Sequence, residues 1–214
     1  MTVDCIHLEP AGPATRIDLR RFDLLHPDGR QLVRGWFNKA LTSMQDDGEC
    51  FEAFIFAWIA VNGWAACVTG RDRDAEYIKA LQRSPELRER FTHQLGINHE
   101  FRKAAEGFQS YWPIFKAQEI RREGNRAIGL HDRRAIVAHY FSHGLRSFEP
   151  ECWKAHTDAG HPVPLDWPHT LAAIYRVRCN LFHGEKSAHS EMDSQIVRSA
   201  LNVLVTYFRA AEIL

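Results

Sequence analysis

The 214-residue sequence lacks the short motifs that identify nucleotide-dependent and serine-based catalysis. It has no P-loop and no G-x-G-x-x-G, the glycine-rich turns that hold phosphates and dinucleotides. It has no G-x-S-x-G, the turn that presents the nucleophilic serine of many hydrolases. No cysteine stands in an obviously activating context. We therefore expect no cofactor and no covalent hydrolysis.

The sequence also lacks an excess of charge, since 27 Lys and Arg are balanced by 27 Asp and Glu. Such a balance does not indicate attraction to nucleic acid through bulk charge, so any contact with nucleic acid requires a local patch. The apolar and charged fractions are ordinary for a folded protein of one domain.

Features of secreted and membrane proteins are scarce. The five cysteines are an odd number without a CxxC pair, which favours reduced thiols over a disulfide framework. The opening residues, MTVDCIHLEPAGPATRIDLRRFD, contain no apolar core and predict no signal peptide. The uncharged residues 53–69 are at the short limit of a membrane span. We expect them to form a buried or dimer-contact helix in a cytoplasmic protein, with no membrane span.

Strand alternation and internal repeats are not evident, whereas helical spacing of apolar residues recurs from about residue 31 onward. Ser84, Pro85 and Glu86 predict a helix start, and Pro113 predicts a helix end. The fold class we expect is all-α: a helical bundle with a long C-terminal helix from about Glu191. Residues 1–30 are interpreted as an irregular arm and 31–214 as a single helical domain, with 121–168 as a candidate insertion.

The penultimate predicted helix, LAAIYRVRCNLFHG, places an arginine within its apolar stripe. Arg178 lies in the middle of that stripe, where a guanidinium is costly unless it is paired. An acid on another helix or an oligomer contact would each satisfy it. Arg176, Asn180 and His183 share the opposite face. Gly184 suits a helix end, so His183 has a plain interpretation as a helix cap.

The run RVRCNLFHGEKS resembles the HEPN superfamily, in its Apea-like branch, whose all-helical domains carry an R-x(4–6)-H signature. The matching residues are Arg178, Asn180 and His183. The apolar run FEAFIFAWIAVNGW and the long closing helix also resemble core elements of that family. The resemblance is convincing over residues 165–214 and looser over 31–120, and it implies a HEPN-like bundle.

The resemblance implies a metal-independent endoribonuclease that cleaves single-stranded RNA by 2′-OH attack, in a toxin or antiviral defence role. His183 would be the acid or base, because histidine titrates near neutral pH. Arg178 would hold the phosphate, because its guanidinium stays protonated and bonds two oxygens. Asn180 would orient the histidine or the phosphate. Arg176 and Lys186 would contact the substrate, although Lys186 is equally a plain loop lysine.

The resemblance also implies a homodimer, because the active cleft of the family usually forms between two copies. An ideal helix turns about 140° beyond a full turn between Arg178 and His183, so the two side chains of one chain splay apart. A loosened helix end, or a cleft shared with a second copy as the family usually forms, would bring them together. Some related toxins have a tyrosine two residues after the motif histidine, where an antitoxin modifies it. Glu185 stands here instead, which weakens that mode of control by an antitoxin or regulatory partner. The alternative function is a non-catalytic module for RNA or protein binding or dimerisation.

Two other patterns leave alternatives open. The basic residues 121–134, RREGNRAIGLHDRR, would either contact phosphate or form a solvated connector. Cys152, His156, His161 and His169 are residue types that bind zinc, but their spacing matches no zinc motif. We interpret them as a coincidental cluster and expect no metal site.

Overall fold

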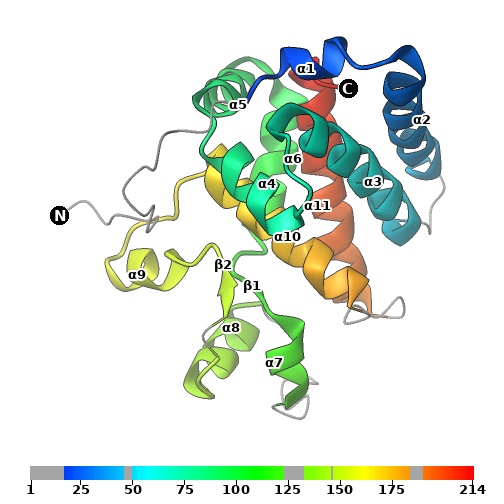
Figure 1. Cartoon of the computed structure of the whole chain (residues 1–214). Coiled ribbons are helices and arrows are strands. Elements are labelled where there is room, and N and C mark those ends of the chain that lie inside the picture. Colours follow the sequence, from blue (N-terminus) through cyan, green and yellow to red (C-terminus); the bar gives the residue numbers. More distant parts are fainter. Residues whose placement is uncertain (1–16, 46–49, 123–132, 146, 184–189) are drawn as a thin grey trace.

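The computed structural model describes residues 17–45, 50–122, 133–145, 147–183 and 190–214, which are mostly helical (Figure 1). The described helices are α1 (Arg20–Asp23), α2 (Pro27–Ser43), α3 (Cys50–Thr69), α4 (Asp74–Gln82), α5 (Pro85–Ile97), α6 (His99–Gln109), α7 (Ala117–Arg122), α8 (Arg133–Ser142), α9 (Trp153–Asp158), α10 (Trp167–Phe182) and α11 (Glu191–Ala210). The described strands are β1 (Ile114–Phe115) and β2 (Phe148–Glu149). The expected mainly helical chain with a long C-terminal helix is confirmed. The two short strands were not predicted.

Several helices begin and end where the sequence supplies caps. The Ser84 hydroxyl accepts a hydrogen bond from the backbone N–H of Leu87 at 3.3 Å, which confirms the predicted start of α5. Gly70 has a φ of +64° just after α3, a left-handed conformation that favours glycine. Helical structure begins earlier than residue 31, because His26 caps α2 and Pro27 occupies its first turn. The 1–30 arm is therefore not irregular throughout.

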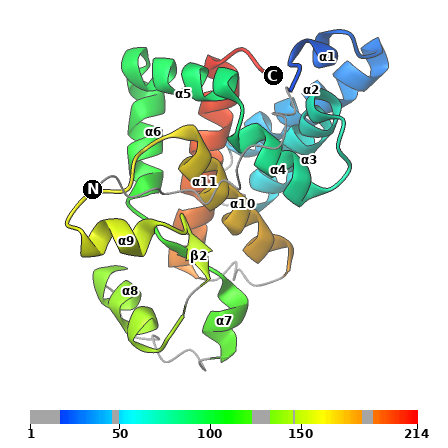
Figure 2. The ribbon, with the colours of Figure 1, turned by 60° about the vertical axis from the view of Figure 1, so that its left-hand side comes forward.

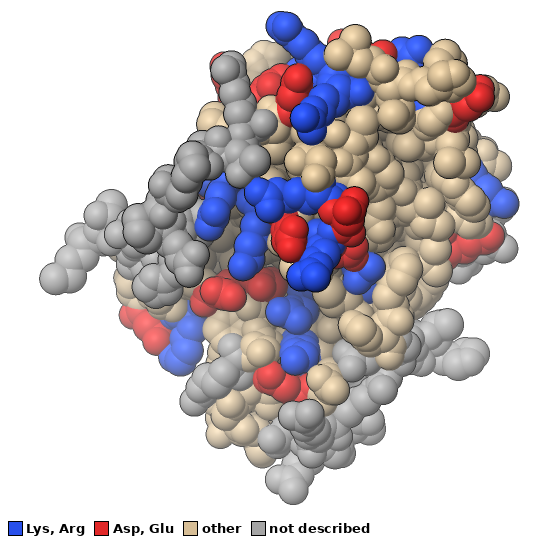
Figure 3. Space-filling model, viewed as in Figure 1, with Lys and Arg blue, Asp and Glu red and all other residues tan. Residues whose placement is uncertain are grey.

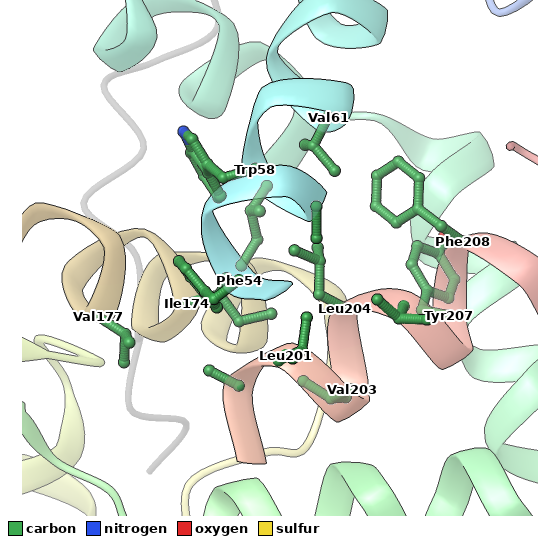
Figure 4. Packing of buried hydrophobic residues seen from close by; sticks show 14 of the residues in the cluster. Phe54, Trp58, Val61, Ile174, Val177, Leu201, Val203, Leu204, Tyr207 and Phe208 are labelled. Atoms are coloured by element: carbon green, nitrogen blue, oxygen red, sulfur yellow. The ribbon is translucent and has the colours of Figure 1, made fainter. Parts of the chain in front are cut away.

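The main core is formed where α3, α10 and α11 meet (Figure 4). Phe54 and Trp58 of α3 are fully buried there beside Ile174 of α10 and Leu204 of α11. The apolar stripe that helical spacing predicts for α11 is buried at Ile196, Ala200, Val203, Leu204, Tyr207 and Ala211, whereas its first member, Met192, is half-buried. Helical spacing predicts a buried stripe for α3 at Phe51, Phe54, Ile55, Trp58, Asn62, Ala65 and Ala66. It is right in part, because Phe54, Trp58 and Ala65 are buried, the other four residues are half-buried, and Val61, Trp64 and Val68 are buried as well.

Residues 114–122, 133–145 and 147–158 form a small lobe beside this bundle (Figures 1 and 2). β1 and β2 pair antiparallel, with Ile114 opposite Glu149 and Phe115 opposite Phe148. The lobe has an apolar cluster of its own, whose buried members are Phe115, Val137, Tyr140, Leu145 and Phe148. Strands of two residues are too short to show alternation, so the sequence pattern could not reveal them.

Helix α3 is the one described helix that is long and apolar enough to cross a membrane. Half of its most apolar stretch is buried within the protein, against α2, α4 and α11. The expected burial of this helix is thus confirmed in part.

The close approach of α2 and α3 makes a glycine necessary. A Cβ atom at Gly63 would lie 2.9 Å from Cγ2 of Val33, whereas a Cβ at Gly96 in α5 would meet nothing within 4 Å. We predict that Gly63→Ala lowers the free energy of unfolding by about 1–3 kcal/mol. Gly96→Ala should raise it by about 0.5–1 kcal/mol, because alanine favours a helix interior. Urea unfolding of both variants is the measurement, and equal effects of the two changes would contradict the close packing.

Candidate functional site

Helix α10 carries the predicted motif residues on two different faces. Arg176 and Asn180 lie on the side covered by the small lobe, where β1 and β2 contact the helix. Arg178 lies on the side of α4. Figure 3 shows Lys and Arg side chains interleaved with Asp and Glu in the middle of this view of the molecule. The two arginines therefore do not act on one groove of the same chain.

Arg178 is held by an acid on another helix, as one of the sequence-based alternatives expected. Its Nη2 lies 2.5 Å from Oδ2 of Asp74, the first residue of α4, and both side chains are less than one-third exposed. Its guanidinium carbon lies 4.7 Å from the ring centroid of Phe182 and 5.8 Å from that of Trp58. An arginine stacked on aromatic rings and paired with a carboxylate is tolerated in a partly buried stripe.

Two tyrosines complete the polar cluster around Arg178. The Tyr77 hydroxyl donates a hydrogen bond to the Asn62 side chain, and burial followed by the nearby Asp74 carboxylate raises its pKa. Burial, together with the neighbouring Cys179 thiol, raises the pKa of Tyr175 to about 12. Both hydroxyls therefore stay protonated at neutral pH, and the carboxylate of Asp74 is the counter-charge of Arg178.

The start of α4 borders an open depression in the surface. It is lined by Thr69, Gly70, Arg71, Asp72, Arg73 and Glu76. The guanidinium groups of Arg71 and Arg73 each lie 3.8 Å from a carboxylate oxygen of Glu76. Long, partly exposed pairs of this kind contribute little to stability. The depression thus places the side chains of Arg71 and Arg73 close to Asp74 at the start of α4.

Arg176 is paired with an acid of the small lobe. Its Nη2 lies 3.6 Å from Oε1 of Glu149 in β2, and the two side chains are 23% and 19% exposed. Burial raises the pKa of Glu149 to about 7, although the attraction of Arg176 acts in the opposite direction. The free-energy cost of burying the Glu149 carboxylate therefore exceeds the stabilisation that it gains from this long ion pair.

Asn180 joins α10 to the small lobe. Its Nδ2 donates to the backbone oxygen of Phe115 at 2.8 Å, and its Oδ1 accepts from the backbone N–H of Ala117 at 3.1 Å. The residue is 2% exposed. The expectation that Asn180 orients His183 or a phosphate gains no support from this position, because both ends of its amide engage the backbone around β1.

His183 lies at the exposed C-terminal end of α10. Its backbone N–H donates to the carbonyl of Cys179 at 3.1 Å, so the helix continues into its cap without loosening. Phe182, expected in the apolar stripe, is 46% exposed instead. Lys186, the other predicted substrate contact, lies outside the described residues.

The two remaining sequence patterns have different outcomes. Most of the basic segment lies outside the described residues, but Arg133 is half-buried, donates to the carbonyl of Tyr111 at 2.8 Å, and has a pKa lowered by burial to about 10. In the Cys–His pattern, Cys152 and His169 are in contact at 3.3 Å, whereas His161 is exposed. Within the described part of the chain, no three His, Cys, Asp or Glu side chains are grouped to hold a metal ion.

Sequence reasoning missed the acids that complete these pairs. Asp74 and Glu149 are far from α10 in the sequence, and no local pattern marks them as partners of Arg178 and Arg176. Asp166 had a detectable signal, because an aspartate before Trp-Pro-His is a helix-start pattern.

Comparison with known proteins finds no matching family model, no matching curated protein and no matching solved structure. The resemblance to HEPN domains therefore depends on the motif in α10 and on the helical architecture.

The Asn180 amide predicts a specific loss of stability. Asn180→Ala should lower the free energy of unfolding by about 2–4 kcal/mol, because it leaves a buried carbonyl and a buried N–H without a partner. Asn38→Ala, at an exposed position in α2, is the control and should change it by less than about 0.5 kcal/mol. Equal stability of the two variants in urea unfolding would refute the role of Asn180 in attaching the small lobe to α10.

The raised pKa of Glu149 predicts a pH-dependent stability. A carboxyl group whose pKa is higher in the folded state binds more protons there than in the unfolded state. The contribution of Glu149 to the free energy of unfolding is therefore fully present below about pH 4.5 and is lost as the pH rises through about 7. Glu149→Gln should therefore gain stability relative to the wild type between pH 5 and pH 8, on the order of 1–3 kcal/mol. Urea unfolding at four pH values measures this difference, with the exposed Glu86→Gln as control. Parallel pH profiles of wild type and Glu149→Gln would contradict it.

Proposed function

We propose that this chain is a cytoplasmic HEPN-type endoribonuclease that cleaves single-stranded RNA without a metal ion, as a homodimer and in a toxin or antiviral defence role. One observation carries the proposal. The guanidinium of Arg178 extends to the ring of Phe182, 4.7 Å away, and the exposed His183 is the next residue. A cation, an exposed aromatic ring and an imidazole thus share one end of α10.

These three groups supply the parts that RNA cleavage needs. A base takes the proton of the ribose 2′-OH, a cation stabilises the charge on the phosphate, and an acid protonates the leaving oxygen. His183 would move the protons and Arg178 would bind the phosphate. Phe182 offers a ring on which an unpaired base stacks.

A second copy of the chain would complete the cleft. His183 from one protomer and Arg178 from the other would face a single phosphate, because the helix end of one chain is not loosened enough to turn its own pair together. The arginines beside Asp74 would provide the local positive charge that the balanced composition requires. An antitoxin or other regulatory protein would bind the same surface.

A non-catalytic module for RNA or protein binding is the second candidate. The observation that favours it is that Arg176 and Arg178 each have a carboxylate partner within the chain. A phosphate has to compete with Asp74 for Arg178, whereas a purely structural arginine needs no such exchange.

The decisive experiment incubates the purified protein with single-stranded RNA in the presence of EDTA. We expect His183→Ala to lower the cleavage rate about 100-fold or more, because it removes the proton-transferring group. His161→Ala changes an exposed histidine between α9 and α10; it is the matched control and should cleave like the wild type. The same oligonucleotide made of DNA should resist cleavage because it lacks the 2′-OH.

Asp74→Asn separates the two roles of Arg178. It removes the ion pair but keeps the arginine, so cleavage should persist in Asp74→Asn and be lost in Arg178→Ala. Equal losses in both variants would favour the non-catalytic module. No cleavage above the His183→Ala background, or cleavage that EDTA abolishes, would refute the proposed function.

A further inference from the structure

A second cluster of reactive groups lies at the opposite end of α10. The Sγ atom of Cys152 is 3.3 Å from Nε2 of His169, and Nδ1 of the same ring is 2.6 Å from Oδ1 of Asp166. Thiol, imidazole and carboxylate are therefore joined in a line, at hydrogen-bond distances. This cluster is separate from the residues to which RNA cleavage is attributed.

The start of the helix fixes the orientation of the histidine. Asp166 is the N-cap of α10, and its Oδ1 also accepts the backbone N–H of His169 at 3.1 Å. One carboxylate oxygen thus holds both the backbone and the ring of His169. The His169 side chain is only 6% exposed, so packing further restricts it.

The carboxylate also determines which ring nitrogen carries the proton. An ionised aspartate only accepts hydrogen bonds, so Nδ1 of His169 must donate to it. In a neutral imidazole, Nε2 is then the acceptor, and it is directed at the thiol of Cys152. This arrangement lets the histidine take the thiol proton while the aspartate stabilises the resulting imidazolium.

Metal binding is a poorer explanation of the cluster. The thiol and the carboxylate contact opposite nitrogens of one ring, so the three groups cannot converge on a single ion. No arrangement in the described residues gathers three such ligands.

Burial decides which reagents can reach the sulfur. Cys152 is 8% exposed, and only the Asp166 end of the line opens to solvent, where that side chain is 39% exposed. A polymer or protein substrate has no room at such a thiol. The class of reagent that remains is a molecule of a few atoms, such as a peroxide.

We propose that Cys152 is a site of oxidation by hydrogen peroxide, activated by His169 and oriented through Asp166. His169 accepts the thiol proton, and the thiolate sulfur attacks one oxygen of the peroxide. The O–O bond breaks, the departing hydroxide takes the proton from the imidazolium, and the products are cysteine sulfenic acid and water. The proposal is independent of RNA cleavage.

The other thiols provide an internal reference. Burial raises the pKa of Cys67 and of Cys50, so both stay protonated and slow to react at neutral pH. Cys67 is nevertheless more exposed than Cys152. Exposure alone therefore predicts that Cys67 reacts before Cys152. Proton transfer from Cys152 to His169 predicts the reverse order.

The test treats the purified chain with hydrogen peroxide at pH 7, traps sulfenic acid with dimedone, and measures each cysteine by mass spectrometry. We expect Cys152 to be trapped about tenfold faster than Cys67. His169→Gln should lower the Cys152 rate about tenfold and leave Cys67 unchanged, and Asp166→Asn should lower it severalfold.

If the cluster has only a structural role, the two substitutions loosen it and expose Cys152. The rate at which dimedone traps Cys152 then rises in the variants instead of falling. A Cys152 rate that does not exceed that of Cys67, or that rises or stays constant in both variants, overturns the proposal. If His169→Gln unfolds the chain, trapping at Cys67 and Cys50 rises as well, and Asp166→Asn then decides. The assay contains no RNA, so its outcome is separate from the test of cleavage.

Discussion

The polar face of α10 is the constraint on which the rest of the structure depends. Positions seven residues apart lie on nearly the same side of a helix, so His169 and Arg176 align, and Asn180 lies close to the same line. Each contacts the small lobe: His169 meets Cys152, Arg176 meets Glu149, and Asn180 bonds the backbone around β1. Buried hydrogen bonds and ion pairs are directional. They therefore restrict the position of the small lobe on the bundle more than apolar packing alone would.

The opposite side of α10 meets a different requirement. Arg178 lies among aromatic rings, so it needs a counter-charge, and Asp74 at the start of α4 supplies it. Acids also suit that position because the N-terminus of a helix is its positive end. A carboxylate that stabilises the start of α4 thereby also compensates the cation of α10. The same pairing sets the condition for the proposed chemistry, because a phosphate that binds Arg178 has to replace or share Asp74.

Apolar periodicity allowed the long helices to be predicted, because a buried stripe repeats within the helix itself. The stripe of α11 and the serine cap of α5 are examples that depend on residues close in sequence. Periodicity also placed Arg178 correctly in a partly buried stripe. It could not identify Asp74, because the partner of a buried charge is chosen by the tertiary fold. The strands β1 and β2 were not predicted for a similar reason. Strands of two residues form only by pairing with a segment more than thirty residues away, and they carry no apolar pattern of their own.

The end of β2 and the residues that follow it are attached to α10 at two points. Glu149 and Cys152 lie three residues apart, and both are attached to the same face of α10, at Arg176 and at His169. A sulfenic acid at Cys152 adds one oxygen atom at a residue that is only 8% exposed, so oxidation would shift this short segment or the helix start beside it. Either displacement strains the pair formed by Glu149 and Arg176. That pair is long and its carboxylate is costly to bury, whereas Asn180 bonds the backbone around β1 at both ends of its amide, so Asn180 is the firmer of the two attachments.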